Sequence, residues 1–178
     1  MLWKTTALIV TLGIAPNAAA QSLDLPENLK VPDGYILDFT AHAEGTQNYV
    51  CLPTSSGHMW TFFGPQATLD VGGQQFTTHF LSPNPAEGGT PRATWQHSGD
   101  TSTVWAAAIA NSTVTPGAIP WLLLRVVGSE GAGRLTATTY IQRVNTGGGT
   151  APVTGCKSAK DTGKKAFVPY FTDYVFYR

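Results

Sequence analysis

Apolar and polar side chains alternate along most of the chain, and glycine or proline interrupts the alternation at short intervals. Between Tyr35 and Glu44, apolar side chains occupy every second position, and Asp38, Thr40 and His42 stand between them. A period of two residues is typical of a strand that buries one face. We therefore expect a strand here, with its polar side chains on a separate face.

A second alternating stretch follows Gly72-Gly73, a pair that favours a two-residue hairpin turn. This stretch places Phe76 and Phe80 on one face and His79 on the other. The pattern predicts that His79, like His42 on the earlier strand, lies on the polar face.

Most of the other apolar segments are also short enough to be single strands. Residues 121–127 have Arg125 as their only polar side chain, which suits a central strand buried on both faces. Residues 82–92 contain three prolines and two glycines and are expected to form a long surface loop. Further strands are expected at 47–52, 59–63, 94–97, 103–110, 135–144 and 167–177.

Short strands between glycine and proline turns, with almost no helical periodicity, predict an all-β fold. We expect one domain over 34–178, folded as an antiparallel β-sandwich or barrel with Gly/Pro-rich loops and at most short helices. Residues 21–33 have little periodicity and are expected to form an extended lead-in. The alternative is an α+β fold with one or two short helices.

The first twenty residues have the layout of a secretory signal peptide. A short positive start ends at Lys4, an apolar stretch follows, and residues 18–20 are three alanines of the kind found at cleavage sites. The apolar stretch has about half of the ~20 residues that a membrane span needs. We predict cleavage after Ala20, no membrane span, and a product that is secreted or held in the lumen of the secretory pathway.

The composition excludes several classes of protein. The 178 residues include 11 Lys and Arg and 11 Asp and Glu, so the formal net charge is zero. Nucleic-acid binding needs a basic surface, which a balanced chain lacks. Disorder needs few apolar residues, whereas 42% of this chain is hydrophobic. We expect no nucleic-acid partner, and the oligomeric state stays open.

Cys51 and Cys156 are the two cysteines of the chain. In an oxidising compartment an isolated pair usually forms a disulfide, and the alternative is two free buried thiols. Asn111 begins an Asn-Ser-Thr triplet, which is an acceptor for N-glycosylation. A glycosylated Asn111 is expected to lie on an exposed loop.

The histidines do not form a recognised metal or catalytic motif. If the strands that hold His42 and His79 are neighbours, the two rings could converge on a metal with Asp38 or Asp100. In a catalytic interpretation, His79 or His97 acts as a general base and Asp100 orients the ring. The simplest interpretation is that these are surface or hydrogen-bonded histidines.

Other common catalytic and cofactor motifs do not occur. The glycine-rich stretches 128–133 and 147–149 do not match a nucleotide-binding loop, so no cofactor is expected. Arg143 lies in an otherwise apolar and Thr-rich stretch, where it could anchor an anion. We expect it instead to pair with Asp173.

Several longer motifs make the chain resemble a family catalogued as domain of unknown function 3455, whose members are secreted proteins of bacteria and fungi. The resemblance runs from about Pro32 to Tyr177. That family usually has its Trp a few residues after its His, whereas residues 82–91 intervene between His79 and Trp95 here. The resemblance implies a secreted, disulfide-linked domain and no agreed activity. It is carried mainly by GTQNYVC at 45–51, GPQATL at 64–69, IPWLLL at 119–124, YIQRVNTGG at 140–148, and Cys156.

The leading interpretation is a secreted, disulfide-linked β domain that binds a small ligand or acts at the cell surface. Aromatic walls with a few polar groups are typical of ligand pockets, and we expect Tyr49, His79, Trp95 and Arg143 to line one. One alternative is an enzyme of the cyclase or isomerase type that acts on a small secondary metabolite and uses one of the histidines as its base. The other is a metal-binding protein that uses His42 and His79.

Overall fold

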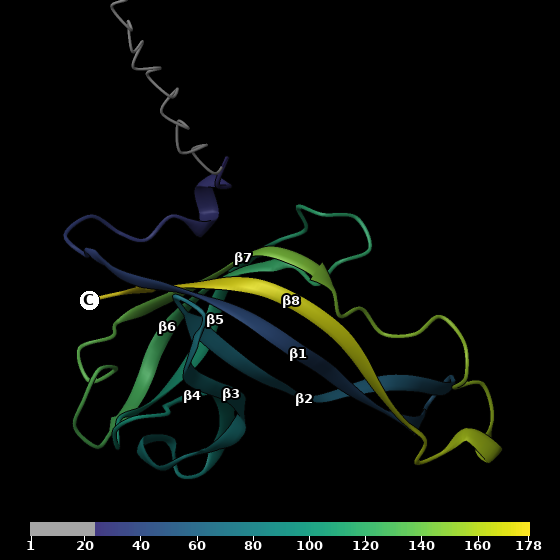
Figure 1. Ribbon diagram of the computed structural model, residues 1–178. Helices are drawn as coiled ribbons and strands as arrows, with labels where there is room; N and C mark the ends of the chain where they lie inside the picture. Colours follow the sequence, from purple (N-terminus) through teal and green to yellow (C-terminus); the bar gives the residue numbers. More distant parts are fainter. Residues whose placement is uncertain (1–23) are drawn as a thin grey trace, which may run out of the picture.

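Eight strands follow one another along residues 24–178, the part of the chain that this computed structural model describes (Figure 1). Each strand pairs antiparallel with the next, and the last pairs with the first, so the sheet closes into a barrel. The predicted all-β fold is confirmed, and of the two predicted architectures the barrel is the observed one. The strands are β1 (Leu37–Thr54), β2 (Gly57–Val71), β3 (Gln74–Asn84), β4 (Thr90–His97), β5 (Thr103–Ser112), β6 (Trp121–Glu130), β7 (Tyr140–Gly148) and β8 (Lys165–Tyr177).

Only short helical turns interrupt the strands in the described residues: η1 (Glu27–Leu29), η2 (Pro85–Glu87) and η3 (Ala159–Asp161). Leu29 in η1 is fully buried against Trp121, Leu123 and Val144 on the outside of the barrel. No helix within residues 24–178 is long and apolar enough to cross a membrane. The predicted signal peptide lies outside the described residues.

Gly45 lies within a strand and does not form the turn that ends one. β1 continues through it for 18 residues, and a Cβ at this position would lie 2.1 Å from the carbonyl oxygen of Gln66. The glycine is therefore needed because β1 and β2 approach closely there. In the same way, β2 runs through Gly64, whose φ of +139° suits glycine, instead of ending there.

The loop expected at 82–92 is shorter than predicted. β3 continues to Asn84, η2 makes the turn, and β4 begins at Thr90. The Asn84 side chain holds this turn because it accepts a hydrogen bond from the backbone N–H of Ala86 and donates to Glu87. The proline-rich sequence is thus compatible with strands that reach well into it.

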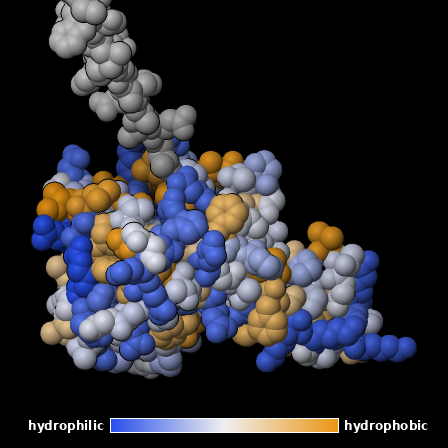
Figure 2. All heavy atoms as spheres, viewed as in Figure 1, coloured by the Kyte–Doolittle hydropathy of each residue, from blue (hydrophilic) through white to orange (hydrophobic). Residues whose placement is uncertain are grey.

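β1, β2 and β8 run past the other strands on one side of the barrel (Figure 1). β2 pairs with β3 only from Gln66 onward, so its first nine residues, 57–65, pair with β1 alone. We call the part of β1, β2 and β8 that projects furthest, residues 50–62 and 165–167, the arm. Figure 2 shows a narrow projection in this part of the molecule, with mostly hydrophilic side chains on the visible face and a few hydrophobic ones.

The predicted disulfide joins Cys51 in the arm to Cys156 in the connection between β7 and β8. Their Cα atoms are 5.4 Å apart, and they are 105 residues apart in sequence. The bond therefore fastens the long β7–β8 connection, residues 149–164, to the arm.

The barrel has two different ends. At the end where β1 begins, which we call the closed end, aromatic rings fill the interior: Phe39 stacks on Phe176 at 4.4 Å between ring centroids and meets Phe76 edge-on at 4.9 Å. The loop between β6 and β7 covers these rings, with Arg134 lying over the Phe39 ring. The other end, from which the arm projects, we call the open end.

Candidate functional site

The interior of the barrel contains a cavity of about 230 Å³ toward the open end. All eight strands contribute side chains to its lining, so the cavity lies inside the barrel and is not a groove on its outer surface. The lining is mostly alanine, leucine and aromatic, with a small number of polar groups. The side chains that decide its chemistry are Gln47, Phe62, His79, Trp95, Arg143 and Tyr174.

His79 faces this interior, which corrects the prediction that it lies on the polar outer face. Only 3% of the residue is exposed, and its ring stacks on Trp95 at 4.2 Å between centroids with an interplanar angle of 14°. The two residues are direct partners in the β3–β4 register, so the intervening residues 82–91 return the chain and do not separate them. The alternation was correct in period, but stacking stabilises the histidine on the face that the pattern assigned to solvent.

The ring of His79 is held in one neutral form. Its Nδ1 lies 2.9 Å from the carbonyl oxygen of Thr94, which can only accept, so Nδ1 carries the proton and Nε2 is the acceptor. Burial lowers the pKa of His79 to about 3; the backbone hydrogen bond opposes this shift, and the positive charge of Arg143 adds to it. The cavity therefore contains an uncharged imidazole at neutral pH.

Arg143 also points inward, and it does not pair with Asp173 as predicted. Its Nε and Nη2 atoms donate to the carbonyl oxygen of Pro120 at 3.0 and 2.8 Å. Arg143 is opposite Tyr174 in the β7–β8 register, one step from Asp173, so the two charged side chains lie on opposite faces of the wall. In the described residues, no carboxylate comes within ion-pair distance of this guanidinium.

Three residues of the lining have buried polar atoms without a hydrogen-bond partner among residues 24–178. They are the side-chain amide nitrogen of Gln47, the indole nitrogen of Trp95 and the hydroxyl of Tyr174. Burial raises the pKa of Tyr174, and the nearby positive charge of Arg143 lowers it by a smaller amount. Each of these atoms can donate a hydrogen bond, but each has almost no accessible surface and so lies behind the open space of the cavity.

Tyr49, the fourth predicted pocket residue, lies beside the cavity and outside its lining. Its hydroxyl donates to the carbonyl oxygen of Gly149 at 2.6 Å, and its ring meets Phe62 edge-on. The structure therefore brings His79, Trp95 and Arg143 together and assigns Tyr49 to the support of the rim.

His97 and Asp100, the remaining catalytic candidates, lie together at the closed end and away from the cavity lining. Nδ1 of His97 is 2.9 Å from the Asp100 carboxylate, which also accepts hydrogen bonds from Ser102 and from the backbone of Arg134. Burial raises the pKa of Asp100, but these hydrogen bonds and His97 outweigh it and lower the pKa to about 2. Asp100 thus contacts His97 and not His79, and it ties two loops together.

His42 lies on the outer surface, as predicted, and does not meet His79. Its Nδ1 is 2.8 Å from Asp173, which also accepts a hydrogen bond from Asn145. Because His79 is inside the barrel, the wall separates the two histidines of the metal hypothesis. Within residues 24–178, no group of three or more His, Cys, Asp or Glu side chains is placed to hold a metal ion.

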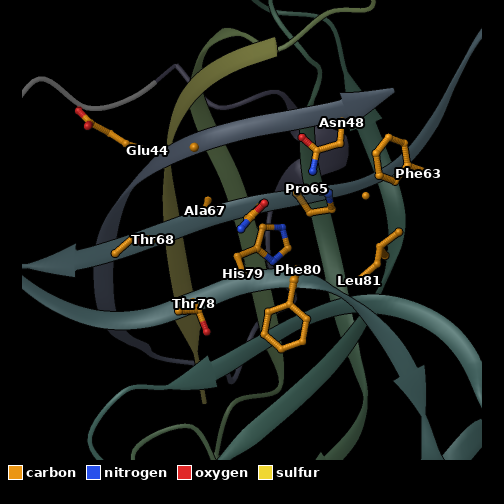
Figure 3. Close-up of a pocket in the computed structure, with 13 residues that line it drawn as sticks. Glu44, Asn48, Phe63, Pro65, Ala67, Thr68, Thr78, His79, Phe80 and Leu81 are labelled. Carbon is orange, nitrogen blue, oxygen red and sulfur yellow. The ribbon is translucent and has the colours of Figure 1, made fainter. Parts of the chain in front are cut away.

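A second hollow of about 630 Å³ lies on the wall formed by β1, β2 and β3. It forms where β2 and β3 separate, and it shares Pro65, His79 and Leu81 with the interior cavity. Figure 3 shows His79 between the two strands, with Glu44 and Phe80 directed away from it. His79 therefore lies in the part of the wall between the outer groove and the interior.

Asn111 is exposed, as its predicted glycosylation requires, but it lies in β5 and not on a loop. Its backbone carbonyl accepts a hydrogen bond from the side chain of Asn28, which leaves its own side chain at the surface.

The chain matches the family described as Protein of unknown function (DUF3455) over residues 32–75 and 70–178. The chain belongs to this family. Comparison of this DUF3455 protein with curated proteins gave no match, and comparison with solved structures gave none either. The cavity of the DUF3455 barrel is therefore interpreted from its own residues.

Gln47 and Tyr174 line the candidate cavity of this DUF3455 protein, and neither was expected from the sequence. Gln47 is two residues before Tyr49 on the same strand, so period two places both on one face. Tyr174 becomes visible only from the β7–β8 register, which sets it opposite Arg143. The alternation that indicates Gln47 was present in the sequence. Tyr174 can be identified only when the register between β7 and β8 is known.

Proposed function

We propose that this DUF3455 protein is a secreted, disulfide-linked barrel that binds a small molecule in its interior cavity. The observation that carries the proposal is the hollow itself, which all eight strands line and into which Arg143 points without a carboxylate partner among the described residues. A concave, mostly apolar hollow with a few polar groups is the usual form of a small-molecule site.

The size of the cavity limits the ligand. At about 230 Å³ it is smaller than the 300–1,000 Å³ that is typical of sites for drug-sized molecules. A ligand with roughly ten non-hydrogen atoms suits this volume. Its apolar part would lie against the alanine and leucine side chains and its polar part against Arg143.

Secretion is part of the same proposal. The disulfide between Cys51 and Cys156 supports it, because such bonds persist in oxidising compartments. The predicted leader sequence and the exposed Asn111 agree with this location. The catalytic alternative is less favoured at His79, because burial lowers the pKa of His79 to about 3 and makes it a weak base at neutral pH.

Saturation-transfer NMR with a panel of small aromatic alcohols, amines, amides and carboxylates tests the proposal. We expect at least one class to bind the wild-type protein and to lose binding in Ala106→Leu. Ala106 is 2% exposed and lines the cavity, so the larger side chain occupies part of the ligand's space.

Ala132→Leu is the matched control, because Ala132 is exposed in the loop at the closed end and the substitution adds the same three carbons there. Circular dichroism and thermal melting establish that both variants fold. If no class binds the wild-type protein, or if binding is equal in both variants, the proposed cavity function is wrong.

A further inference from the structure

We infer that the ligand of the cavity is a small monocarboxylic acid with an apolar body, held by Arg143. This inference rests on the proposed function and specifies its ligand class. Three observations support it: the sign of the charge in the cavity, the type of hydrogen-bonding groups, and the nature of the walls.

The cavity carries one positive charge that the protein does not neutralise. Two arginines line it, and Arg92 forms an ion pair with Glu87 through two hydrogen bonds of 2.7 and 2.8 Å. Arg143 donates to the carbonyl oxygen of Pro120 and has no carboxylate partner among residues 24–178, so its charge is not compensated there. Its charge reaches the surrounding groups: burial raises the pKa of Tyr49 and Tyr174 and lowers that of His79, and the charge of Arg143 makes a smaller, lowering contribution at all three.

The hydrogen-bonding groups around Arg143 favour an anion over a cation. Arg143 can donate hydrogen bonds to an anion, and the lining contains no carboxylate. A carboxylate can accept several hydrogen bonds at once, and bonds between charged partners are stronger than those between neutral ones. An amine in the same place would meet the positive charge of Arg143 and no carboxylate.

The number of charges limits the ligand to one negative charge. His79 is neutral, so it does not add a second cation to Arg143. A dianion would bring one uncompensated charge into a space lined by alanine, leucine and aromatic side chains, where burial of an unpaired charge is costly. These walls suit an apolar body attached to a single carboxylate.

Isothermal titration calorimetry at pH 7 on the purified protein with its disulfide intact tests the inference. The probes are benzoate, its neutral isostere benzamide, and terephthalate, which has two carboxylates. We expect benzoate to bind at least about tenfold more tightly than benzamide and terephthalate, which is the scale of one hydrogen-bonded charge.

The decisive variant is Arg143→Gln, which is expected to remove the preference for benzoate over benzamide. Arg143→Lys keeps the charge and is expected to retain part of the preference. Arg125→Gln is the matched control, because Arg125 is exposed on β6 and outside the cavity lining, and it should leave all affinities unchanged.

The outcomes separate this inference from the proposed function. If benzamide binds as tightly as benzoate, or if Arg143→Gln keeps the preference, the carboxylate class is wrong although the cavity still binds small molecules. If no probe binds here and none binds in the wider NMR panel, both proposals are wrong.

Discussion

Burial changes the chemistry of single residues in this barrel, and His79 is the clearest case. Its ring stacks on Trp95 and donates to the carbonyl oxygen of Thr94, so the neutral form is well held. The charged form would face Arg143 and Tyr174 with no carboxylate in the cavity lining. Protonation of this ring therefore opposes folding.

The first prediction follows from the lowered pKa of His79. Its pKa is about 3 in the folded protein and about 6.5 in the unfolded chain, so between these values the unfolded state binds more protons. Stability is fully present above pH 6.5 and falls by about 1.4 kcal/mol for each pH unit below it. Urea unfolding at pH 7 and pH 5 measures this loss.

His79→Gln is expected to flatten that dependence between pH 7 and pH 5, because glutamine does not titrate. His58→Gln on the arm is the control and should keep the wild-type dependence. An unchanged pH dependence in His79→Gln would show that another group causes it.

The second prediction concerns the hydroxyl of Tyr174, which is buried without a hydrogen-bond partner. Tyr174→Phe removes the cost of burying it and is expected to leave the free energy of unfolding unchanged or raise it by up to about 1 kcal/mol. Tyr177→Phe should instead lower stability by about 1 kcal/mol, because the hydroxyl of Tyr177 donates to Gln142 at 2.8 Å. Urea unfolding compares the two, and a larger loss in Tyr174→Phe would contradict the prediction.

At the scale of the elements, the strand pattern follows from side-chain periodicity, but strand lengths do not. Alternation and the Gly72-Gly73 turn predicted the strands around them, and both glycines have the positive φ that the turn requires. Gly45 and Gly64 look like turn signals in the sequence, whereas the structure uses Gly45 for close approach of two strands and Gly64 for its backbone conformation. A single sequence does not distinguish these uses, because each depends on a neighbour far along the chain or on local geometry.

The candidate site was predictable in part for the same reason. Residue type alone drew attention to His79, Trp95 and Arg143. The expected partner of Arg143 was wrong because the choice between Asp173 and Tyr174 depends on a one-residue step in register. Registers between strands are set by the whole sheet, and that information is not local.

The third prediction concerns the arm and the connection that the disulfide fastens to it. In the chain-entropy model a closed loop of about one hundred residues contributes roughly 4–5 kcal/mol. Replacing both Cys51 and Cys156 by serine is expected to lower the free energy of unfolding by about that amount in urea. Reduced wild-type protein should behave like the variant, and equal stability of oxidised and reduced protein would contradict the prediction.

At the scale of the whole molecule, closure of the barrel couples all strands. Seven of the eight pairings join strands adjacent in sequence, and the eighth joins β1 to β8. Gly45 is a register partner of Ala67 on β2 and of Tyr170 on β8, so it lies where both pairings of β1 meet. A substitution at Gly45 therefore affects the pairing of β1 with both neighbours and, through them, the whole closed sheet.

The fourth prediction is that Gly45→Ala destabilises the entire barrel. The new Cβ would lie 2.1 Å from the carbonyl oxygen of Gln66, so the strands must separate. We expect a loss of more than about 2 kcal/mol in a single cooperative transition. Thr40→Ala, at an exposed position of the same strand, should cost far less, and a similar loss in both variants would contradict the role of close approach.

The bond between Cys51 and Cys156 has a consequence for where the protein can keep a bound molecule. Cys51 is two residues from Tyr49, whose hydroxyl holds Gly149 in the same connection that the disulfide anchors. Reduction would free the connection at Cys156 and leave the Tyr49 hydroxyl as one of its remaining ties to β1, although neither sulfur lines the cavity. Under the proposed function, the protein would therefore retain its ligand less well when the disulfide is reduced.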